Sequence, residues 1–478
     1  MAFTEFYCDP SNGSNLNAGS TTASAAAFTY ASGNWVASTG VFTVASGNPS
    51  SDGVAVGDFA SVYANGSTTT GFVGRVTARD ATTITVSLTA KIGTAPTDGT
   101  GTRTLKIAGA WKGPNAADGF PLTLIANTLT NAAGDYPRVN LKNNATYNVT
   151  ATIGVTGSGP YFVQGYSSTV NDGGRATIDG GTSGTSYNLL YFNTANTFCT
   201  RWQDLIFQNN GATGGAKGIL LNTSSTRFNT WYRCKFSGFR GAAVQFNGAN
   251  AIIECEVVGS VKNGSDYHVY CSHSNAESSL ILRCYIHDPA GASARGIGLG
   301  SINTTKVISS IIANHTSHGV EVGANNQSGI HCINCDIYNN TGQGIDIQTG
   351  TNTADIYIVN CNFIKNGGYG VRGSGIAGWS GYLINCAFGA GTQANTSGTT
   401  NNLKGIVESG SITYAADVTP WVDPANGNFT INLAAAKNAG RGAFGTGLTS
   451  TVGYPDIGAA QHQDASSTAA CPVGGFVL

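Results

Sequence analysis

The chain has 478 residues, of which 41% are apolar, 10% are charged and 66 are glycine, and its formal net charge is -1. The apolar fraction is too high and the charge too low for a disordered chain. Basic runs are absent and no stretch approaches about 18 uninterrupted apolar residues, so the sequence predicts neither a nucleic-acid partner nor a membrane span.

The first 110 residues show no repeat. Residues 1–27 form a polar, turn-rich N-terminal segment, and they lack a basic region followed by an apolar core, so no Sec signal peptide is predicted. Residues 28–110 alternate apolar and polar side chains over 54–63, 71–77 and 83–88. This pattern predicts a small antiparallel β-barrel or β-sandwich domain.

Residues 111–200 are predicted to cap a repeating stack and to form its first irregular coils. The segment 122–132 could be a capping helix or an opening strand, because the open end of such a stack exposes a sheet edge that must be covered. The segments 138–141, 161–165 and 176–181 mark these irregular coils.

A regular repeat occupies residues 201–395. Its copies align on Cys335, Cys361 and Cys386, which lie 26 and then 25 residues apart. The same frame extends back to Asp204 in steps of 30, 21, 29, 26, 25, 26 and 25 residues, which makes eight turns. About 25 residues with period-two alternation accommodate three short strands and three turns, so the sequence predicts one coil of a parallel β-helix per repeat.

Six cysteines share one position of the repeat: Cys234, Cys255, Cys284, Cys335, Cys361 and Cys386. The frame puts Ser310 and Asp204 at the same position. We expect a column of inward, reduced thiols that pack as small hydrophobes, with disulfide pairing as the alternative. On this basis a serine in place of Cys361 would bury a hydroxyl at a cost of about 1 to 3 kcal/mol.

Cys332 and Cys335 have the C-x-x-C spacing that elsewhere marks a redox or metal motif. Here Cys335 belongs to the repeat and Cys332 replaces an apolar residue, so no metal and no cofactor are predicted. The residue before the cysteine is asparagine at 334, 360 and 385. These asparagines are expected to form an amide ladder, either at a turn or on the outside.

A second strand in each coil begins with glycine, at 218–221, 296–299, 319–322, 344–347 and 370–372. Its middle residue points outward and is Glu321, Asp346 and Arg372 on three successive coils. Two carboxylates about 5 Å apart match the pair of a retaining glycosidase, and like charges at that distance raise one pKa. The alternative is a solvated column that Arg372 partly neutralises. Glu321 and Asp346 are therefore candidate catalytic residues only if the protein is an enzyme, and Arg372 is a candidate binding residue.

Six of the seven histidines fall between His268 and His331. His315 and His318 are candidate binding residues for a glycan. The different positions of the histidines in the repeat argue against one shared site for a metal or a glycan, and the alternative is a polar or pH-sensitive surface. Tyr267, Trp379 and Tyr382 could stack on sugars or cover a core edge.

After about residue 395 the period fades. Residues 396–461 are predicted to form terminal coils and a cap, and residues 462–478 an extended tail.

The opening sequence at 6–20, the repeats and the segment 455–461 resemble the right-handed parallel β-helix proteins of the pectate-lyase-like superfold. This resemblance covers both ends and the middle of the chain. It implies a right-handed parallel β-helix, and together with the patterns at the two ends the predicted fold is all-β, a right-handed parallel β-helix with a small N-terminal β-barrel or sandwich domain and a C-terminal extension. The superfold hosts lyases, glycosidases, adhesins and virion appendages, so it leaves function open.

The favoured hypothesis is a bacteriophage virion structural protein, such as a head or tail appendage, a spike or a decoration protein. It would be made in the host cytoplasm and located in the virion, with other virion proteins as partners and a homo-trimer expected by analogy. One alternative is a polysaccharide-degrading tailspike or secreted extracellular depolymerase, which would be a glycoside hydrolase or a polysaccharide lyase. Another is an adhesin that binds a host surface glycan.

Overall fold

The computed structural model describes residues 3–12, 26–67, 72–93, 95–108, 136–155, 160, 162–192, 199–222, 227–261, 266–272, 279–300, 304–323, 329–348, 355–373, 380–389, 406–415, 418–433, 436 and 459. The chain divides into two compact units. The first comprises Met1–Thr182, Tyr187–Asn210 and Ser225–Cys234, and the second comprises Ser183–Ser186, Gly211–Ser224 and Lys235–Leu478. The predicted segment at 122–132, the predicted tail at 462–478, His273 and Trp379 lie outside the described residues.

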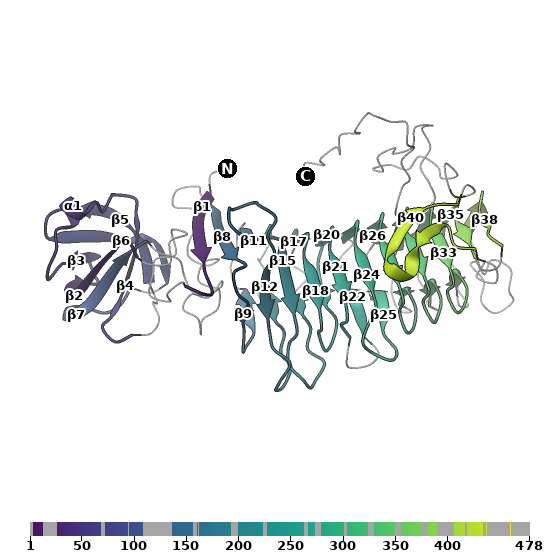
Figure 1. The fold of residues 1–478 in the computed structure, drawn as a ribbon, viewed down its shortest axis with the longest axis horizontal. Helices are drawn as coiled ribbons and strands as arrows, with labels where there is room; N and C mark the ends of the chain where they lie inside the picture. Colours follow the sequence, from purple (N-terminus) through teal and green to yellow (C-terminus); the bar gives the residue numbers. More distant parts are fainter. Residues whose placement is uncertain are drawn as a thin grey trace, which may run out of the picture. The chain divides into compact units, whose positions relative to one another are not determined.

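The first unit contains a closed antiparallel β-barrel with strand order β2-β3-β6-β5-β4-β7 (Figure 1). Its elements are β2 (Phe28–Val36), β3 (Val41–Thr43), the helix α1 (Pro49–Asp52), β4 (Phe59–Ala64), β5 (Phe72–Arg79), β6 (Thr83–Gly93) and β7 (Gly99–Ile107). The core includes Trp35, Phe42 and Phe72, whose side chains are at most 1% exposed. The predicted small β-domain is confirmed, and it is a barrel.

The same unit carries coils made of three parallel sheets. The first sheet contains β1 (Phe3–Cys8), β8 (Tyr136–Lys142), β11 (Phe162–Tyr166), β14 (Arg201–Gln203) and β17 (Thr230–Tyr232). The second contains β9 (Tyr147–Asn148), β12 (Ala176–Asp179) and β15 (Leu205–Gln208). The third contains β10 (Ile153–Val155) and β13 (Leu190–Phe192).

The strand β1 is a rung that sequence reasoning missed, because residues 1–27 have no partner within one repeat length. It pairs in parallel with β8, from Phe3 opposite Tyr136 to Cys8 opposite Leu141. Phe6 and Cys8 are fully buried. The barrel is therefore inserted between two neighbouring strands of the first sheet.

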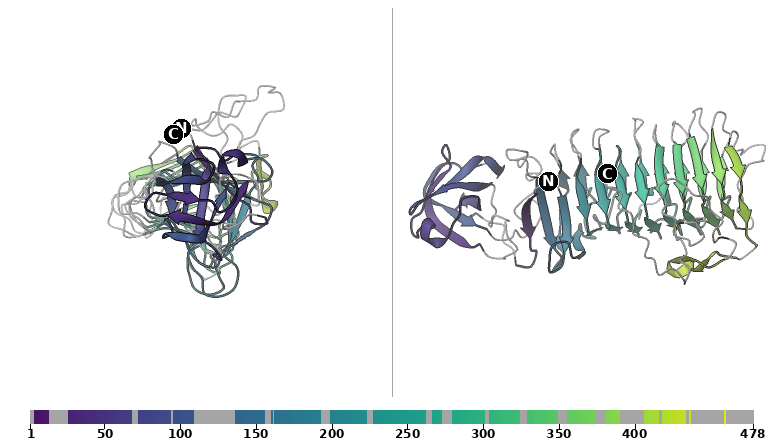
Figure 2. Two further views of the ribbon diagram at one scale, coloured as in Figure 1. Left: turned by 90° about the vertical axis from the view of Figure 1, so that its left-hand side faces the viewer. Right: turned by 90° about the horizontal axis from the view of Figure 1, so that it is seen from above.

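The second unit contains the remaining strands of the same three parallel sheets (Figure 2). Its first sheet contains β20 (Ala251–Ile253), β23 (Leu280–Leu282), β26 (Thr304–Ile308), β29 (Gly329–Ile333), β32 (Asp355–Val359), β35 (Ser380–Ile384) and β37 (Ile406–Ser409). Its second contains β18 (Lys235–Ser237), β21 (Glu256–Val258), β24 (Tyr285–His287), β27 (Ile311–Ala313), β30 (Asp336–Tyr338), β33 (Asn362–Ile364), β36 (Ala387–Phe388) and β38 (Ile412–Thr413). Its third contains β16 (Ile219–Leu221), β19 (Val244–Phe246), β22 (Tyr267–Cys271), β25 (Arg295–Leu299), β28 (Val320–Val322), β31 (Ile345–Ile347) and β34 (Val371–Gly373).

The corner between the first and second sheets explains the residue that precedes each cysteine. This residue is left-handed in every regular coil, with φ between 48° and 55° at Asp204, Arg233, Glu254, Arg283, Ser309, Asn334, Asn360 and Asn385. Asparagine tolerates this conformation better than other side chains that carry a Cβ. The Asn360 amide donates to Oδ1 of Asn334 at 3.0 Å inside the structure. The predicted amide ladder therefore lies at a turn.

The cysteine column is confirmed as a buried core column. All six cysteines are free and at most 3% exposed, and Ser310 takes the same place and is fully buried. Each thiol lies within hydrogen-bond range of the carbonyl two residues earlier, for example 3.3 Å from Cys361 Sγ to Val359 O. The Ser310 hydroxyl donates to the equivalent carbonyl of Ile308 at 2.9 Å.

The predicted place of Asp204 in this column is wrong by one residue. Asp204 occupies the left-handed corner and forms an ion pair of 2.6 Å with Arg233, the corner residue of the next coil. Leu205 is fully buried and holds the core position instead. A frame that is off by one residue exchanges the inward and outward faces of a strand, which would put the Asp204 carboxylate among apolar side chains.

A hairpin after the last coil covers the outer face of the second sheet in the second unit (Figure 1). It consists of β39 (Trp421–Asp423), the 3-10 helix η1 (Pro424–Asn426) and β40 (Asn428–Ile431). The Phe429 ring centroid lies 5.8 Å from that of Tyr338 and 5.9 Å from that of Tyr285. This hairpin, rather than a further coil, shields the apolar face.

Candidate functional site

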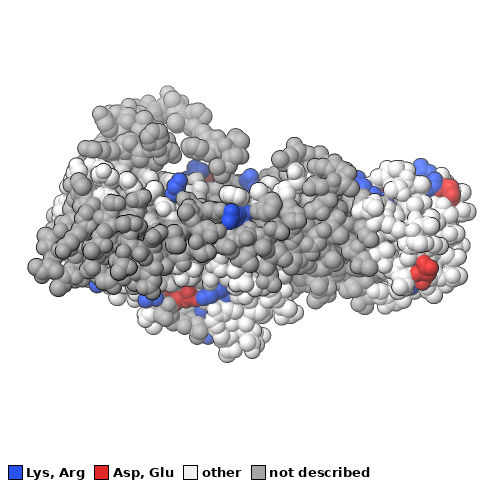
Figure 3. All heavy atoms as spheres, turned by 180° about the vertical axis from the view of Figure 1, so that it is seen from behind, with Lys and Arg blue, Asp and Glu red and all other residues white. Residues whose placement is uncertain are grey.

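Charged side chains are sparse on the described surface, and Figure 3 shows them scattered over the face seen from behind. The outward column of the third sheet is therefore a distinct feature. The strand register places Glu321 opposite Asp346, and Asp346 opposite Arg372, on β28, β31 and β34. The predicted stacking of these three residues is thus present in the structure.

The two carboxylates are buried, in contrast to the solvated column considered above. Glu321 is 4% exposed and Asp346 is 1% exposed. An ion pair of 2.6 Å joins Glu321 Oε2 to Nε of Arg295, and the Tyr267 hydroxyl donates to Glu321 Oε1 at 2.6 Å. Every oxygen of Glu321 thus has a close polar neighbour.

Arg372 binds Asp346 with two parallel hydrogen bonds. Its Nε donates to Oδ1 at 2.7 Å and its Nη2 donates to Oδ2 at 2.9 Å. This fork geometry is the strongest form of an arginine–carboxylate contact, and it raises the pKa of Arg372. Two guanidinium groups therefore balance the two carboxylates of the column.

His318 lies beside Asp346, with 3.5 Å between its Nε2 and Oδ2 of the carboxylate. Its Nδ1 accepts a hydrogen bond of 2.9 Å from the backbone N–H of Gln343. The proton of the neutral ring is therefore on Nε2, which faces the carboxylate. Burial lowers the pKa of His318, so the ring is neutral at pH 7.

The position of Tyr267 depends on a glycine. Gly298 precedes Glu321 in the outward column, and a Cβ at Gly298 would lie 2.4 Å from the Tyr267 ring. The absence of a side chain lets the ring cover the sheet and bring its hydroxyl to Glu321. Burial and the bond to Glu321 both raise the pKa of Tyr267, so the hydroxyl remains a donor.

One atom each of His318, Glu321 and Asp346 lies within 4.8 Å of the others, which is a spacing that could hold a metal ion. Arg295 and Arg372 already contact the two carboxylates. A metal ion at this place would have to displace the two guanidinium groups or lie close to their positive charges. The charge of the cluster therefore favours the arginine–carboxylate ion pairs over a bound metal.

A protein-family model described as "Right handed beta helix region" matches residues 217–388. The chain is a right-handed parallel β-helix repeat protein. No curated protein sequence matches it. Among solved structures, the pectate lyase Pel9A is 15% identical, with a TM-score of 0.43, and the match covers 70% of this chain and 94% of that one.

Two further structures resemble the β-helix at similar levels. ORF18 of Geobacillus virus E2 is 13% identical, with a TM-score of 0.42, over 62% of this chain and 57% of that one. The A-module of the mannuronan C-5 epimerase AlgE4 of Azotobacter vinelandii is 12% identical, with a TM-score of 0.39, over 59% and 87%. At these sequence identities and TM-scores, the activities of the three proteins are not assigned to this chain.

The other predicted binding histidine, His315, lies inside the β-helix and is 1% exposed. Its Nδ1 lies 2.9 Å from Oδ1 of Asn340, and its Nε2 lies 3.2 Å from Nδ1 of the fully buried His268. Asn340 in turn donates to Asn366 at 2.9 Å. His315 thus continues a polar column of the core, and the structure separates it from His318.

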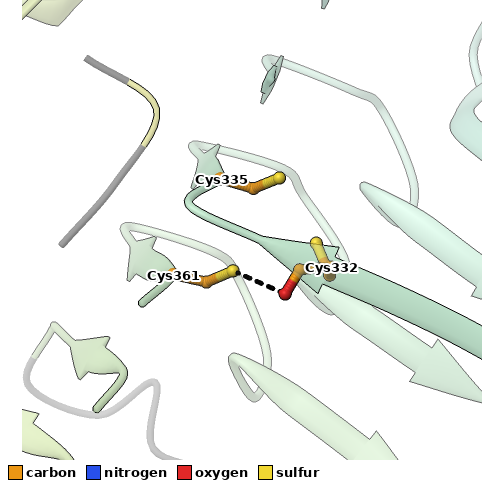
Figure 4. Close-up of side chains that lie close together, drawn as sticks. All are labelled: Cys332, Cys335 and Cys361. Atoms are coloured by element: carbon orange, nitrogen blue, oxygen red, sulfur yellow. Dashed lines mark hydrogen bonds between the residues drawn. The ribbon is translucent and has the colours of Figure 1, made fainter. Parts of the chain in front are cut away.

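The thiols of Cys332, Cys335 and Cys361 form a second group with metal-ligand spacing, with sulfur atoms within 4.8 Å of one another (Figure 4). All three are fully buried. The pKa of each is raised, by the neighbouring thiols and burial at Cys332 and chiefly by burial at Cys335 and Cys361, which opposes the thiolate that a metal ligand must supply. Cys361 instead contacts the Cys332 carbonyl, at 3.4 Å.

Sequence reasoning identified the column of Glu321, Asp346 and Arg372 but missed Arg295. Arg295 lies three residues before Gly298 on β25, so it is displaced from the column and reaches Glu321 only through its long side chain. None of the helices among the described residues has the length and apolar character that a membrane crossing requires.

Proposed function

We propose that this β-helix is a structural protein of a bacteriophage virion, either a head or tail appendage, a spike or a decoration protein. The observation that carries the proposal is the state of the Glu321 and Asp346 carboxylates. They are buried and each is paired with an arginine. A general acid or nucleophile needs access to its substrate, whereas a neutralised ion-pair column braces neighbouring coils.

The cysteine column supports the same proposal. A parallel β-helix whose polar side chains bond from coil to coil suits a protein that must persist outside a cell. The described cysteines are nevertheless all free, which suits folding in a reducing compartment. Virion proteins combine both conditions, because they fold in the host cytoplasm and act after its lysis.

Mass spectrometry of purified virions tests the proposal. We expect to find the chain in particles at a defined copy number, together with the other virion proteins that it contacts. Light scattering of the purified protein should show a homo-trimer. Its absence from particles that form normally would contradict the proposal. A monomer both in solution and in particles would contradict the trimer alone.

The spacing of the two carboxylates favours a second candidate, a glycoside hydrolase or polysaccharide lyase of the tailspike or secreted type. Their nearest oxygens lie within 4.8 Å, close to the separation used by retaining glycosidases. In this alternative Glu321 and Asp346 are catalytic, and Arg372 and His318 bind the glycan.

The protein would be incubated with capsular and pectin-like glycans while new reducing ends and unsaturated uronates are measured. We expect no turnover. Turnover that disappears in Glu321→Gln or Asp346→Asn but persists in Glu256→Gln would replace the structural proposal. Glu256 is a suitable control because it is a paired carboxylate on the second sheet, 2.9 Å from Lys235.

A further inference from the structure

In the second unit, the outer face of the first sheet carries an aliphatic side chain at the same place in six successive coils. The strand register aligns these residues on β20, β23, β26, β29, β32 and β35. They are Ile253, Leu282, Ile308, Ile333, Val359 and Ile384, which we call the aliphatic column. All six are partly exposed. At the strand spacing of about 4.8 Å, the column is about 24 Å long.

Outward side chains on the other two sheets of this unit are buried by their neighbours. On the second sheet, Tyr338 and Ile364 are 5% and 1% exposed, because the hairpin of β39 and β40 packs on them. On the third sheet, arginine and tyrosine side chains bury Glu321 and Asp346. The aliphatic column, by contrast, stays partly exposed. Contiguous apolar surface of this kind marks an interaction site.

The two sides of the aliphatic column differ. On one side the same strands carry aromatic rings, with 4.8 Å between the centroids of His331 and Tyr357 and 5.5 Å between those of Tyr357 and Tyr382. Tyr382 is 44% exposed, and tyrosine is enriched in protein interfaces. On the other side, the left-handed corner follows one residue after the column. The aliphatic column therefore lies at the edge of the sheet.

We propose that the aliphatic column is the contact between three copies of this chain, arranged in parallel around a three-fold axis. The inference rests on the proposed homo-trimer and names the surface that forms it. The column repeats at the strand spacing in every copy, so parallel copies at the same height bring identical side chains together in six layers. Each layer buries three aliphatic side chains, and this burial drives association.

Lys306 favours three copies over two. Its side chain is exposed and lies two residues before Ile308 on β26. Two copies packed sheet against sheet would bury the Lys306 ammonium groups among apolar side chains, which is unfavourable. Around a three-fold axis only the sheet edges meet. Lys306 then remains in solvent, and the exposed ring of Tyr382 can pack on the next copy.

The first test is analytical ultracentrifugation of the full chain at micromolar concentration. We expect the native chain to sediment as a trimer. Ile333→Glu combined with Val359→Glu should sediment as a monomer with the native circular dichroism spectrum, because carboxylates in adjacent layers oppose burial. Leu220→Glu is the matched control and should remain a trimer. Leu220 is a partly exposed aliphatic residue at the centre of β16, on the third sheet.

The second test is cross-linking by a mild oxidant, and it reports how the copies are arranged. Ile308→Cys and Val359→Cys are measured as separate variants. Parallel copies place each new cysteine beside its own counterpart, within reach of a disulfide. Both variants should therefore give linked chains that the native chain and Leu220→Cys do not give. An antiparallel pair would link at most one of them, because only one position can lie on its two-fold axis.

The proposal is overturned if the native chain is a dimer, if the folded glutamate variant stays a trimer, or if either cysteine variant fails to link. Where the glutamate variant does not fold, the cysteine variants decide. A native monomer would overturn both this inference and the trimer, while the virion proposal would still stand or fall by mass spectrometry of particles. A trimer through the aliphatic column that is absent from virions would reject the virion proposal alone.

Discussion

His315 makes the stability of the β-helix sensitive to acid. The ring is buried between His268 and Asn340, and burial lowers the pKa of His315 to about 4. In the unfolded chain the pKa is about 6.5. The unfolded state therefore binds a proton first as the pH falls, and stability is lost between about pH 6.5 and 4 and then levels off.

The loss can be estimated between pH 7 and pH 5, where carboxylates titrate little. A folded pKa of about 4 against an unfolded pKa of about 6.5 costs about 2 kcal/mol over this interval. Burial also lowers the pKa of His268, which acts in the same direction. The predicted quantity is the change in unfolding free energy between pH 7 and pH 5, so the test does not depend on how stable the protein is at pH 7.

The neighbouring coils supply the matched variant. Asn340 and Asn366 hold the position of His315 in the next two coils, so His315→Asn keeps a polar column without a titratable ring. Urea unfolding would be followed by tryptophan fluorescence at pH 5, 6 and 7, with amide exchange near β27 as a local measure. We expect the variant to lose about 2 kcal/mol less than the native chain. Parallel stability curves would refute the burial argument.

Three further outcomes concern the core and the outer column. Cys361→Ser should cost less than about 1 kcal/mol of unfolding free energy in urea, below the cost of about 1 to 3 kcal/mol expected from the sequence, because Ser310 already bonds the equivalent carbonyl. Asn360→Gly should be more stable than Asn360→Ala by about 1 kcal/mol in the same assay, because this corner has φ 55°. Arg372→Gln should cost about 3 kcal/mol by leaving the buried Asp346 carboxylate unpaired, and adding Asp346→Asn should restore much of the loss.

Each of these outcomes has a contradicting result. A cost for the serine variant near 3 kcal/mol would show that the hydroxyl finds no acceptor. Equal stability of the glycine and alanine variants would remove the left-handed corner as the reason for asparagine. Additive effects of the Arg372 and Asp346 substitutions would mean that the two side chains do not interact.

The repeat was readable from the sequence because each coil places the same residue types at the same corner. A left-handed corner selects asparagine at 334, 360 and 385, and the inward position next to it selects a small apolar side chain. Both requirements act on the residues of a single corner, so the same residue types recur once per coil. At Asp204 the next residue, which holds the core position, is Leu205 and not a cysteine, so the sequence offers no marker there and the predicted frame is one residue off.

Of the candidate site, the sequence by itself determined which residues share a column: Glu321, Asp346 and Arg372 follow from the period and from strand alternation. Only the tertiary structure decided that these carboxylates are buried and paired with arginines, because that depends on Arg295 and on the Tyr267 ring over Gly298. The same holds for β1, which pairs with a strand more than a hundred residues away, on the far side of the inserted barrel. Periodicity reports contacts between equivalent positions of neighbouring coils. Contacts between positions that are not equivalent leave no period and emerge only when the chain is folded.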